Sequence, residues 1–522
     1  MRFKTLALVA AIALLPSAMS ATAQTAQPTD PLKAAIEKAI LTNPEVSARF
    51  NAYRASVDAN DAARAAYYPR LDLNASVGHD SDKISTRSPE AQSLSRAGTS
   101  LSLTQLLWDG LGTQREVARV GHERLSRYFE LLDVTEQTAL EAARAYYDVQ
   151  RFRRLVQLAE DNYVQHKYAS LQIQSRFKAG VGRGVDLEQA NARLALAESN
   201  LSTELANLHD VTTRYMRVVG DAPPRQLPAL SPLNKSMPAS ADQAMNTAIQ
   251  QSPAVSASIE TLRATRSSVE IRRSAFQPRV EARVRAGGGN NFDGVRDQKR
   301  DSSAEITLNW NLFNGGADAA RVRQQVNLLN QAADLRDKTC RDTRQVSVIA
   351  FNDTRKLVDQ LDMLDRNTIA IEKARDAYRQ QFDIGQRSLL DLLNAENEVY
   401  TARRSYANAE FDLGIAYART HAAMNQLTTQ VGVARIDPAV VDATGWAAGE
   451  DAPGRCPIVT AEVPGIDRNK LDERARQLAA MVAPIAPPRS AAPAASAPMA
   501  QPVPAAPASA ASQPAKKAGK TQ

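Results

Sequence analysis

The sequence has few cysteines, few aromatic residues and no cluster of histidines. Two cysteines among 522 residues exclude a disulfide-stapled miniature scaffold and a Cys-rich zinc module. Aromatic residues make up only 5% of the chain, which is low for a large globular core. The five histidines lack the spacing of metal ligands, so we predict no metal site and no cofactor. A net charge of +7 is too small to indicate a nucleic-acid partner.

Catalytic motifs are also missing from the sequence, which contains neither a nucleophile elbow nor a convincing triad. The glycine-rich stretch 180–184 lacks the preceding strand and the Lys-Ser/Thr pair of a phosphate-binding loop, so a turn is the better interpretation. We therefore do not expect an enzyme.

The first 23 residues have the pattern of a secretory signal. A basic start at Met1–Lys4 precedes an apolar run from Leu6 to Leu15, and Ala21-Thr-Ala23 fits a cleavage site. No cysteine lies near that site, so lipid attachment is not expected there. No later stretch approaches the ~20 apolar residues of a transmembrane helix. An exported chain of this kind enters a membrane only as a β-barrel.

The rest of the chain is organised as an internal repeat. Asn43-Pro44 matches Ser252-Pro253, Trp108-Asp-Gly matches Phe313-Asn-Gly, and further matches follow in the same order. We predict repeats over 24–220 and 241–427, separated by a proline-rich linker at 221–240. Each repeat is expected to hold a helix, a β-hairpin, a long helix and a helix: 31–67, 70–108, 113–179 and 186–219, then 240–276, 279–313, 317–384 and 388–427.

The two hairpins are predicted from alternation of apolar and polar residues. Leu71, Leu73 and Val77 share one face, and Asp72 and Asn74 share the other. Strands of about 9–11 residues match the span of a tilted membrane strand, with polar turns expected at 80–95 and 287–302. Aromatic residues gather where strands meet helices, as in an interfacial girdle; the alternative is a cluster closing a soluble sandwich. These residues are Tyr67, Tyr68, Trp108, Phe276, Trp310 and Phe313.

The long helices imply an elongated, oligomeric assembly. At 1.5 Å per residue, ~65 helical residues span about 100 Å, and half-length helices stacked end to end would cover each rod. An imperfect heptad stripe from Val322 to Phe382 favours coiled-coil packing into a cylinder of antiparallel helices. Four strands cannot close a barrel, so other copies must complete it. Two copies give eight strands and a filled lumen, and three give twelve with room for an opening.

Two turn motifs carry a family resemblance. Phe177-Lys-Ala-Gly180 continues through Val185-Asp186-Leu187 to Ala190, and the second motif runs from Phe382 to Ala395. With the duplicated element order, they resemble the TolC-type outer-membrane channel family over residues 30–427. The resemblance implies a homotrimeric 12-stranded barrel in outer-membrane lipid and a periplasmic helical tunnel. It also implies export with a periplasmic adaptor and an inner-membrane pump.

The missing lipidation cysteine is more similar to the type I secretion branch of that family. The leading expectation is therefore an exit duct that works with an ABC transporter. The same duct serving a multidrug efflux pump, for example of the RND type, is the close alternative. A periplasmic coiled-coil scaffold that never enters the membrane is the alternative from another class.

The resemblance places the gate at the tips of the helical hairpins, where Gly180 and Gly385 reverse the chain. It implies that Asp391 rings the tunnel entrance and attracts cations, while Asn394 stands where a second aspartate is common. It also implies a lock between Arg387 and Asp186 that opens like an iris. Phe382 occupies the position of the lock's aromatic residue but has no hydroxyl group. Helix capping alone would also account for either aspartate.

The two cysteines favour one bridge in an exported protein, although two free thiols are the alternative. A Cys340–Cys456 bridge would hold the C-terminal segment 428–483 against the middle of the tunnel. From residue 484 to 522 the chain is rich in Ala, Pro and Ser, which predicts a disordered tail.

Overall fold

The computed structural model describes residues 30–225, 227, 233–434, 443–457 and 467–481. The predicted signal peptide and the Ala/Pro-rich tail lie outside these residues, as does part of the proline-rich linker. The chain divides into a unit that ends at Thr460 and a second unit from Ala461 onward. Within the second unit, α10 (Arg468–Met481) is a single helix.

Each repeat begins with two helices rather than one. α1 (Pro31–Thr42) and α2 (Pro44–Arg64) open the first repeat, and α5 (Ala241–Gln251) and α6 (Pro253–Ser274) open the second. The prediction of unbroken helices over 31–67 and 240–276 is therefore wrong. The residue before a proline is driven out of the helical region, and Asn43 and Ser252 have ψ of 124° and 118°. Their side chains then cap the second helix of each pair.

Two rods of equal length run through the first unit. α3 (Gly112–Lys178) and α7 (Ala317–Asp383) each have 67 residues, which corresponds to about 100 Å. α4 (Gly184–Val219) returns from the tip of α3, and α8 (Leu389–Ala423) returns from the tip of α7. None of the described helices has the length and apolarity needed to cross a bilayer.

The second repeat ends earlier than predicted. Asn425 has φ of +57° and turns the chain after α8, so a helix from 388 to 427 is wrong at its end. A short helix, α9 (Leu427–Val431), follows, and the buried Glu136 carboxylate on α3 accepts hydrogen bonds from its first residues.

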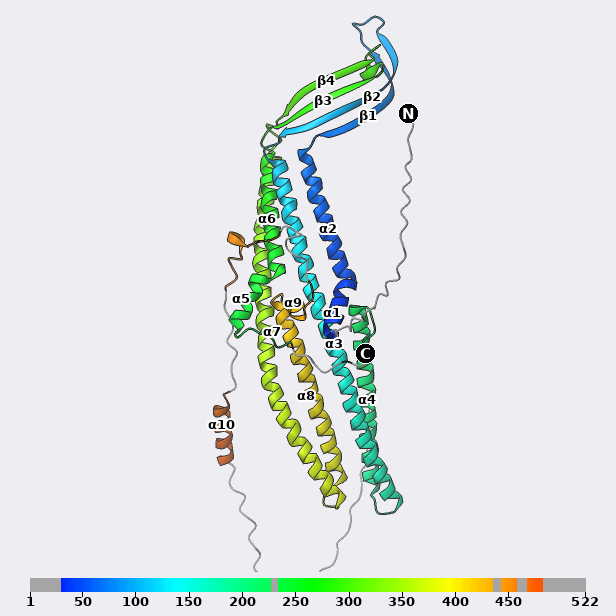
Figure 1. Ribbon diagram of the computed structural model, residues 1–522, viewed down its shortest axis with the longest axis vertical. Helices are drawn as coiled ribbons and strands as arrows, with labels where there is room; N and C mark the ends of the chain where they lie inside the picture. Colours follow the sequence, from blue (N-terminus) through cyan, green and yellow to red (C-terminus); the bar gives the residue numbers. More distant parts are fainter. Residues whose placement is uncertain (1–29, 226, 228–232, 435–442, 458–466, 482–522) are drawn as a thin grey trace, which may run out of the picture. The chain divides into compact units, whose positions relative to one another are not determined.

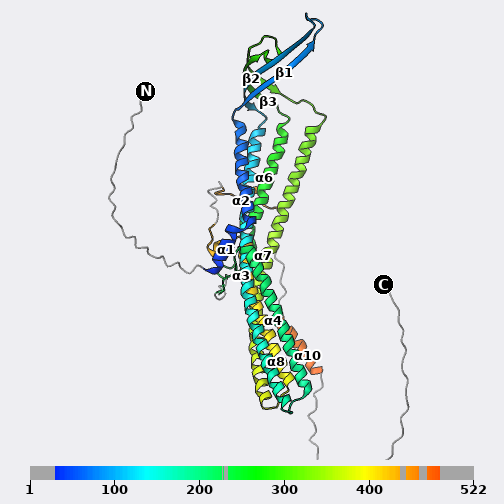
Figure 2. The same ribbon diagram turned by 90° about the vertical axis from the view of Figure 1, so that its right-hand side faces the viewer.

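The half-length helices stack to cover the rods. α2 and α6 flank the half of α3 that lies nearer the sheet, while α4 and α8 flank the other half (Figure 1). α7 packs on α6 and then on α8, so each level contains four neighbouring helices (Figure 2). Their order is α2–α3–α6–α7 near the sheet and α4–α3–α8–α7 near the tips. α2 and α4 thus form one edge of the layer, and α7 forms the other.

The strands form one antiparallel sheet in the order β1-β2-β3-β4. Its members are β1 (Arg70–Lys83), β2 (Ala91–Trp108), β3 (Arg279–Asn290) and β4 (Arg300–Asn309). The predicted turns are too long, since the observed ones span 84–90 and 291–299, and β4 ends before Trp310 and Leu312. Polar residues did not mark the turns because the backbone of a polar segment pairs as well as that of an apolar one.

The predicted disulfide is confirmed. Cys340 on α7 is bonded to Cys456, with 6.0 Å between the Cα atoms. Residues 443–457, here called the strap, cross α3, α6 and α7. Arg263 donates to Asp451 at 2.9 Å, and Arg455 donates to Asp337 at 2.7 Å. Within the predicted C-terminal segment, the strap lies against these three helices.

Reduction is expected to release the strap. The bridge links residues 116 positions apart, so loop entropy alone makes it worth up to about 5 kcal/mol. We expect a protease to cleave 443–457 much faster after reduction, while α3 and α7 remain intact. Cys456→Ser should be cleaved rapidly without a reductant, and adding one should change nothing. Equal cleavage of oxidised and reduced wild-type protein would contradict this expectation.

Candidate functional site

One face of the sheet is mainly apolar, with Thr99, Gln105 and Ser302 as polar members of it by register. The register pairs Leu71 with Leu103 and Leu73 with Leu101, and carries the same face across to β3 and β4. Its apolar residues are Leu71, Leu73, Ala75, Val77, Leu101, Leu103, Val280, Ala282, Val284, Ala286, Ala304, Ile306 and Leu308. Leu73 and Ile306 are more than 70% exposed in the single chain. A band of this kind is stable only when lipid or another apolar surface covers it.

The opposite face is polar and carries paired charges. Asp72, Ser102, Arg283 and Glu305 lie on it by register. Arg283 lies 3.6 Å from Glu305, and Arg279 donates to Glu281 at 2.7 Å. A sheet with one apolar and one ionic face separates lipid from water, so the polar face is the candidate wall of an aqueous passage.

The layer is open at both edges. β1 and β4 each pair with only one strand in the described chain. α7 has 9 buried residues against 26 on α3, although the two helices have the same length. Apolar side chains on the free part of α7, including Leu328, Leu335, Val346 and Ile349, are 40% to 54% exposed. These edges present unsatisfied hydrogen-bonding groups and apolar surface to a further chain.

All six aromatic residues of the predicted girdle are exposed and lie at the junction of sheet and helices. Trp108 pairs with Val280 and therefore lies on the apolar face. Trp310 follows β4, and its indole donates to the backbone oxygen of Phe276 at 3.0 Å. The positions suit an interfacial belt, a role that stays a prediction.

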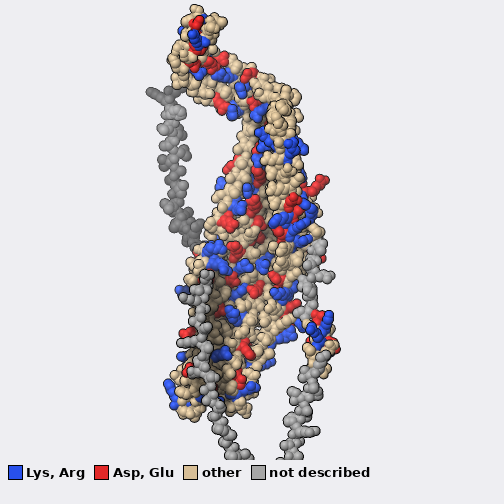
Figure 3. Space-filling view, turned by 180° about the vertical axis from the view of Figure 1, so that it is seen from behind, with Lys and Arg blue, Asp and Glu red and all other residues tan. Residues whose placement is uncertain are grey.

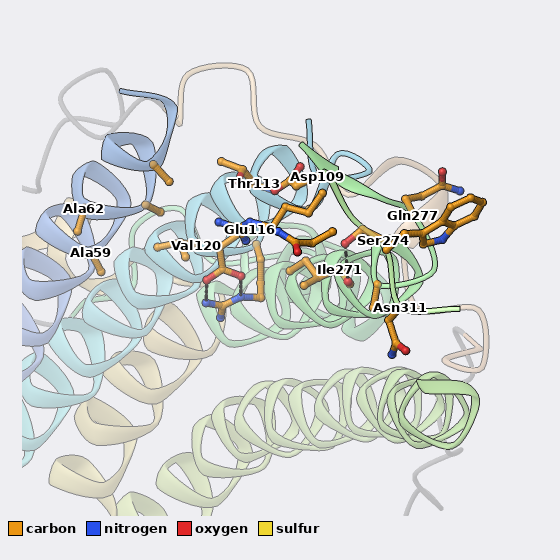
Figure 4. A pocket seen from close by; sticks show the side chains of 18 residues that line it. Ala59, Ala62, Asp109, Thr113, Glu116, Val120, Ile271, Ser274, Gln277 and Asn311 are labelled. Carbon is orange, nitrogen blue, oxygen red and sulfur yellow. Dashed lines mark hydrogen bonds and ion pairs between the residues drawn. The ribbon is translucent and has the colours of Figure 1, made fainter. Parts of the chain in front are cut away.

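A pocket of about 990 Å³ lies directly beneath the sheet, between α2, α3 and α6 (Figure 4). Ala59 and Ala62 line it from α2, Thr113 and Glu116 from α3, and Ile271 from α6 (Figure 4). The pocket reaches Arg279 and Asn309, which belong to the polar face of the sheet. We interpret it as part of the passage wall where the strand section joins the helical section.

The helical surface beyond the sheet carries charges of both signs. Lys and Arg side chains alternate with Asp and Glu along the described helices on the face seen in Figure 3. Such a mixed surface suits an aqueous compartment.

The hairpin tips contain the predicted glycine turns. Gly180 and Gly385 have φ of +76° and +78°, a conformation that strongly favours glycine. Ser388 caps α8: its hydroxyl accepts from the Asp391 N–H at 3.2 Å and donates to the Asp391 carboxylate at 2.9 Å. Asp186 lies in the first turn of α4. In one chain the Asp391 carboxylate thus holds the capping residue Ser388, and its role in an entrance ring stays a prediction.

The structure does not bring Arg387 to Asp186 within one chain. The Arg387 guanidinium lies over the Tyr378 ring at 4.7 Å, donates to Gln381 at 2.9 Å and lies 3.7 Å from Asp391. Arg387 is therefore held on its own hairpin. The lock remains a prediction for a contact between copies of the chain.

Phe382 and Asn394 connect the two hairpins instead. Phe382 is buried, and the Arg176 guanidinium of α3 lies over its ring at 4.9 Å. Asn394 accepts a hydrogen bond from Arg193 of α4 at 2.8 Å. Asn394 therefore links the two tips by a hydrogen bond, in addition to replacing the negative charge that an aspartate would carry at this position.

Two further features near the tips escape sequence reasoning. Glu396 is buried and accepts from Arg375 and Arg379 at 3.0 and 2.6 Å. Arg379 also donates to Gln165 of α3 at 2.7 Å, which adds a second polar link between the hairpins. The spacing of Glu396 from Leu392 and Leu393 could have predicted its burial. It lies four and three residues after these buried leucines, and therefore on the same inner side of α8.

A sheet with a lipid-facing side, continued by a layer of long helices, defines an outer-membrane channel protein with a periplasmic tunnel section. Residues 35–220 and 244–426 match the family described as "Outer membrane efflux protein". These segments cover more than half of the chain and coincide with the two repeats, so the chain belongs to this family. The TolC-type resemblance and the outer-membrane location are thereby confirmed.

Proteins similar to this chain are named for efflux in one case and for protein secretion in another. It is 27% identical over 438 residues to the outer membrane efflux protein BepC of Brucella suis biovar 1, covering 83% of this chain and 93% of BepC. It is 25% identical over 406 residues to the alkaline protease secretion protein AprF of Pseudomonas aeruginosa, covering 73% and 81%. The solved outer-membrane channel OprN shares the fold, with a TM-score of 0.68 at 20% identity over 76% of this chain and 90% of OprN.

Proposed function

We propose that three copies of this chain form the exit duct of a type I secretion system. An inner-membrane ABC transporter and a periplasmic adaptor would deliver cargo to the helical tips. The observation that carries the proposal is the four-stranded sheet, which has one apolar face and two open edges. Three sheets give a twelve-stranded barrel with an opening, whereas two give eight strands and a filled interior.

Ring closure follows from the two edges of the layer. β4 of one copy would pair with β1 of the next, and the exposed α7 would pack against α2 and α4 of the same neighbour. Such head-to-tail contacts use different surfaces and close into a ring when the rotation permits. The exposed apolar residues of α7 and the unpaired strand edges support this arrangement.

A second candidate is the exit duct of a multidrug efflux pump. The relative BepC, which is named as an efflux protein, favours it. The relative AprF, which is named for secretion of alkaline protease, favours the type I system. The passage wall itself does not separate the two, since a passive duct need not recognise its cargo.

A deletion strain complemented with the full chain tests the proposal. If the duct serves type I secretion, deletion removes particular proteins from the culture medium and complementation restores them. Loss of drug tolerance with an unchanged secretome would replace type I secretion by efflux. A mature chain that is a water-soluble monomer without detergent and forms no channels in planar bilayers would refute both.

A further inference from the structure

The β3–β4 loop, residues 291–299, folds back onto the sheet. Phe292 in this loop is only 4% exposed. Across the described hairpins, 70–108 and 279–309, it is the one large apolar side chain that is buried. The large side chains of the apolar face, such as Leu73 and Ile306, are exposed in the single chain. The Phe292 ring differs because it packs against other residues of the same chain.

That partner is a notch made by two glycines on neighbouring strands. A Cβ atom added to Gly98 would lie 2.5 Å from the Phe292 ring, and one added to Gly287 would lie 2.4 Å from it. Carbon atoms pack at about 3.5–4.0 Å, so no larger residue fits at either position. Glycine weakens a strand, and the ring gives a reason for Gly287 near the end of β3, whereas Gly288 and Gly289 lie against the backbone of neighbouring residues.

The notch lies on the polar face of the sheet. The register pairs Ser100 with Gly287 and Gly98 with Gly289, and these residues alternate with the apolar Leu101 and Ala286. The loop therefore bends over the side that faces water in a closed barrel, away from the lipid-facing side.

Polar contacts fix the loop in this position. Arg285 donates two hydrogen bonds to Asp293, at 2.7 and 2.9 Å, and its guanidinium lies 5.4 Å from the centre of the Phe292 ring. Asn291 donates to the backbone oxygen of Ser95 on β2 at 2.8 Å and accepts from the N–H of Asp297 at 2.9 Å. A bidentate Arg–carboxylate pair combined with a buried ring is a specific anchorage.

The other loop is built differently. β1 and β2 pair up to Lys83 and Ala91, so their hairpin extends past the end of β3 and β4 (Figure 2). The contacts of Arg87 in its turn are local, with Asp82 at 2.7 Å and the backbone oxygen of Pro89 at 3.5 Å. Of the two described turns, the β3–β4 loop folds back onto the sheet and the β1–β2 turn does not.

We propose that the β3–β4 loop is a size-selecting constriction at the outer mouth of the channel. The proposal rests on the proposed function, because the polar face becomes a lumen only in the closed barrel. Three anchored loops then project into one mouth, and Phe292 with Arg285 and Asp293 sets the size of what can leave. The gate at the helical tips acts at the opposite end.

Polymer exclusion in planar bilayers tests the constriction from one side at a time. Added protein inserts its sheet first, because the polar helical section stays on the side of addition. Polyethylene glycols on the far side therefore probe the outer mouth. For Phe292→Ala, we expect the polymer mass at which exclusion begins to rise about twofold or more on that side, and to stay unchanged on the helical side. Val295→Ala, a change at an exposed position of the same loop, is the matched control and should resemble the wild type.

The outcomes are distinguishable. Equal exclusion for Phe292→Ala and wild type, or an equal rise at both ends, would overturn the constriction. If Phe292→Ala does not assemble, Asp293→Asn keeps the ring, removes the ion pair and should shift exclusion in the same direction. A wild-type chain that forms no channels would instead refute the proposed function.

Discussion

Replacing Glu260 with alanine is expected to detach the strap and to destabilise the protein by about 3–5 kcal/mol, the usual cost of breaking a buried ionic pair. The Glu260 side chain is completely buried on α6. It accepts hydrogen bonds from His122 on α3, Arg263 on α6 and Trp446 on the strap, each at 2.7 Å. Alanine would leave three half-buried donors without this acceptor, and α3, α6 and the strap would lose their common contact.

The effect can be followed by the emission of Trp446 and by thermal unfolding of the assembled protein. Trp446 also contacts the Phe129 ring at 4.9 Å, so detachment changes its surroundings. Asp362→Ala is the matched control: it removes an exposed carboxylate that pairs with Arg366 at 2.6 Å, and such pairs contribute about 0–1 kcal/mol. Similar unfolding of both variants would contradict the role given to Glu260.

The same cluster predicts a pH dependence. Burial by itself would raise the pKa of Glu260, but the hydrogen bonds from His122 and Trp446 outweigh it and lower the pKa below the ordinary value of 4.5. A lowered pKa in the folded state means that the ionised carboxylate stabilises the fold above pH 4.5 and that this contribution is lost in stronger acid. The stability difference between wild type and Glu260→Gln should therefore shrink as the pH falls below 4.5.

Periodicity revealed most of the fold because each element separates two environments. Leu71, Leu73 and Val77 alternate with polar residues since one side of the sheet faces lipid and the other faces water. The long rods were visible as stretches without proline, and Gly180 and Gly385 marked their ends. The breaks at Pro44 and Pro253 were also visible, since a capping residue precedes each proline, but the helical pattern on both sides suggested one continuous helix.

The contacts of the candidate site could not be read in the same way. Arg193 and Asn394 are 201 residues apart, and no local pattern pairs them. Asn394 was interpreted by comparison with a family aspartate, so its hydrogen bond was missed. Phe292 likewise lies in a polar turn, and its burial depends on glycines of two other strand positions. Cys340 and Cys456 were paired only because no other cysteine was available.

Weakening the contacts between the two helical tips is expected to open the tunnel entrance. The α3–α4 hairpin and the α7–α8 hairpin are joined by the Arg193–Asn394 hydrogen bond and by Phe382 under Arg176. A hydrogen bond from a charged group contributes about 1.5–3 kcal/mol. Its loss from a closed state shifts the ratio of open to closed channels by about 10- to 150-fold.

Single-channel conductance of Arg193→Ala and Phe382→Ala measures this shift. We expect both variants to open more often and to conduct more than wild type, with Phe382→Ala showing the larger change because its ring also belongs to the buried core of the tips. Arg366→Ala removes an arginine of the same kind from the exposed side of α7 and should leave the conductance unchanged.

Arg387→Ala separates the two possible locks. In one chain Arg387 contacts Tyr378, Gln381 and Asp391 of its own hairpin, so its removal should not loosen the link between the two hairpins. If Arg387→Ala opens the channel as strongly as Phe382→Ala, the lock acts between copies of the chain, through Asp186 of the neighbour. If only Arg193→Ala and Phe382→Ala open it, the entrance is held inside each copy. Unchanged conductance in all three variants would contradict an iris held by these contacts, because the Arg193–Asn394 bond, the Phe382 ring and Arg387 would each have been removed without effect.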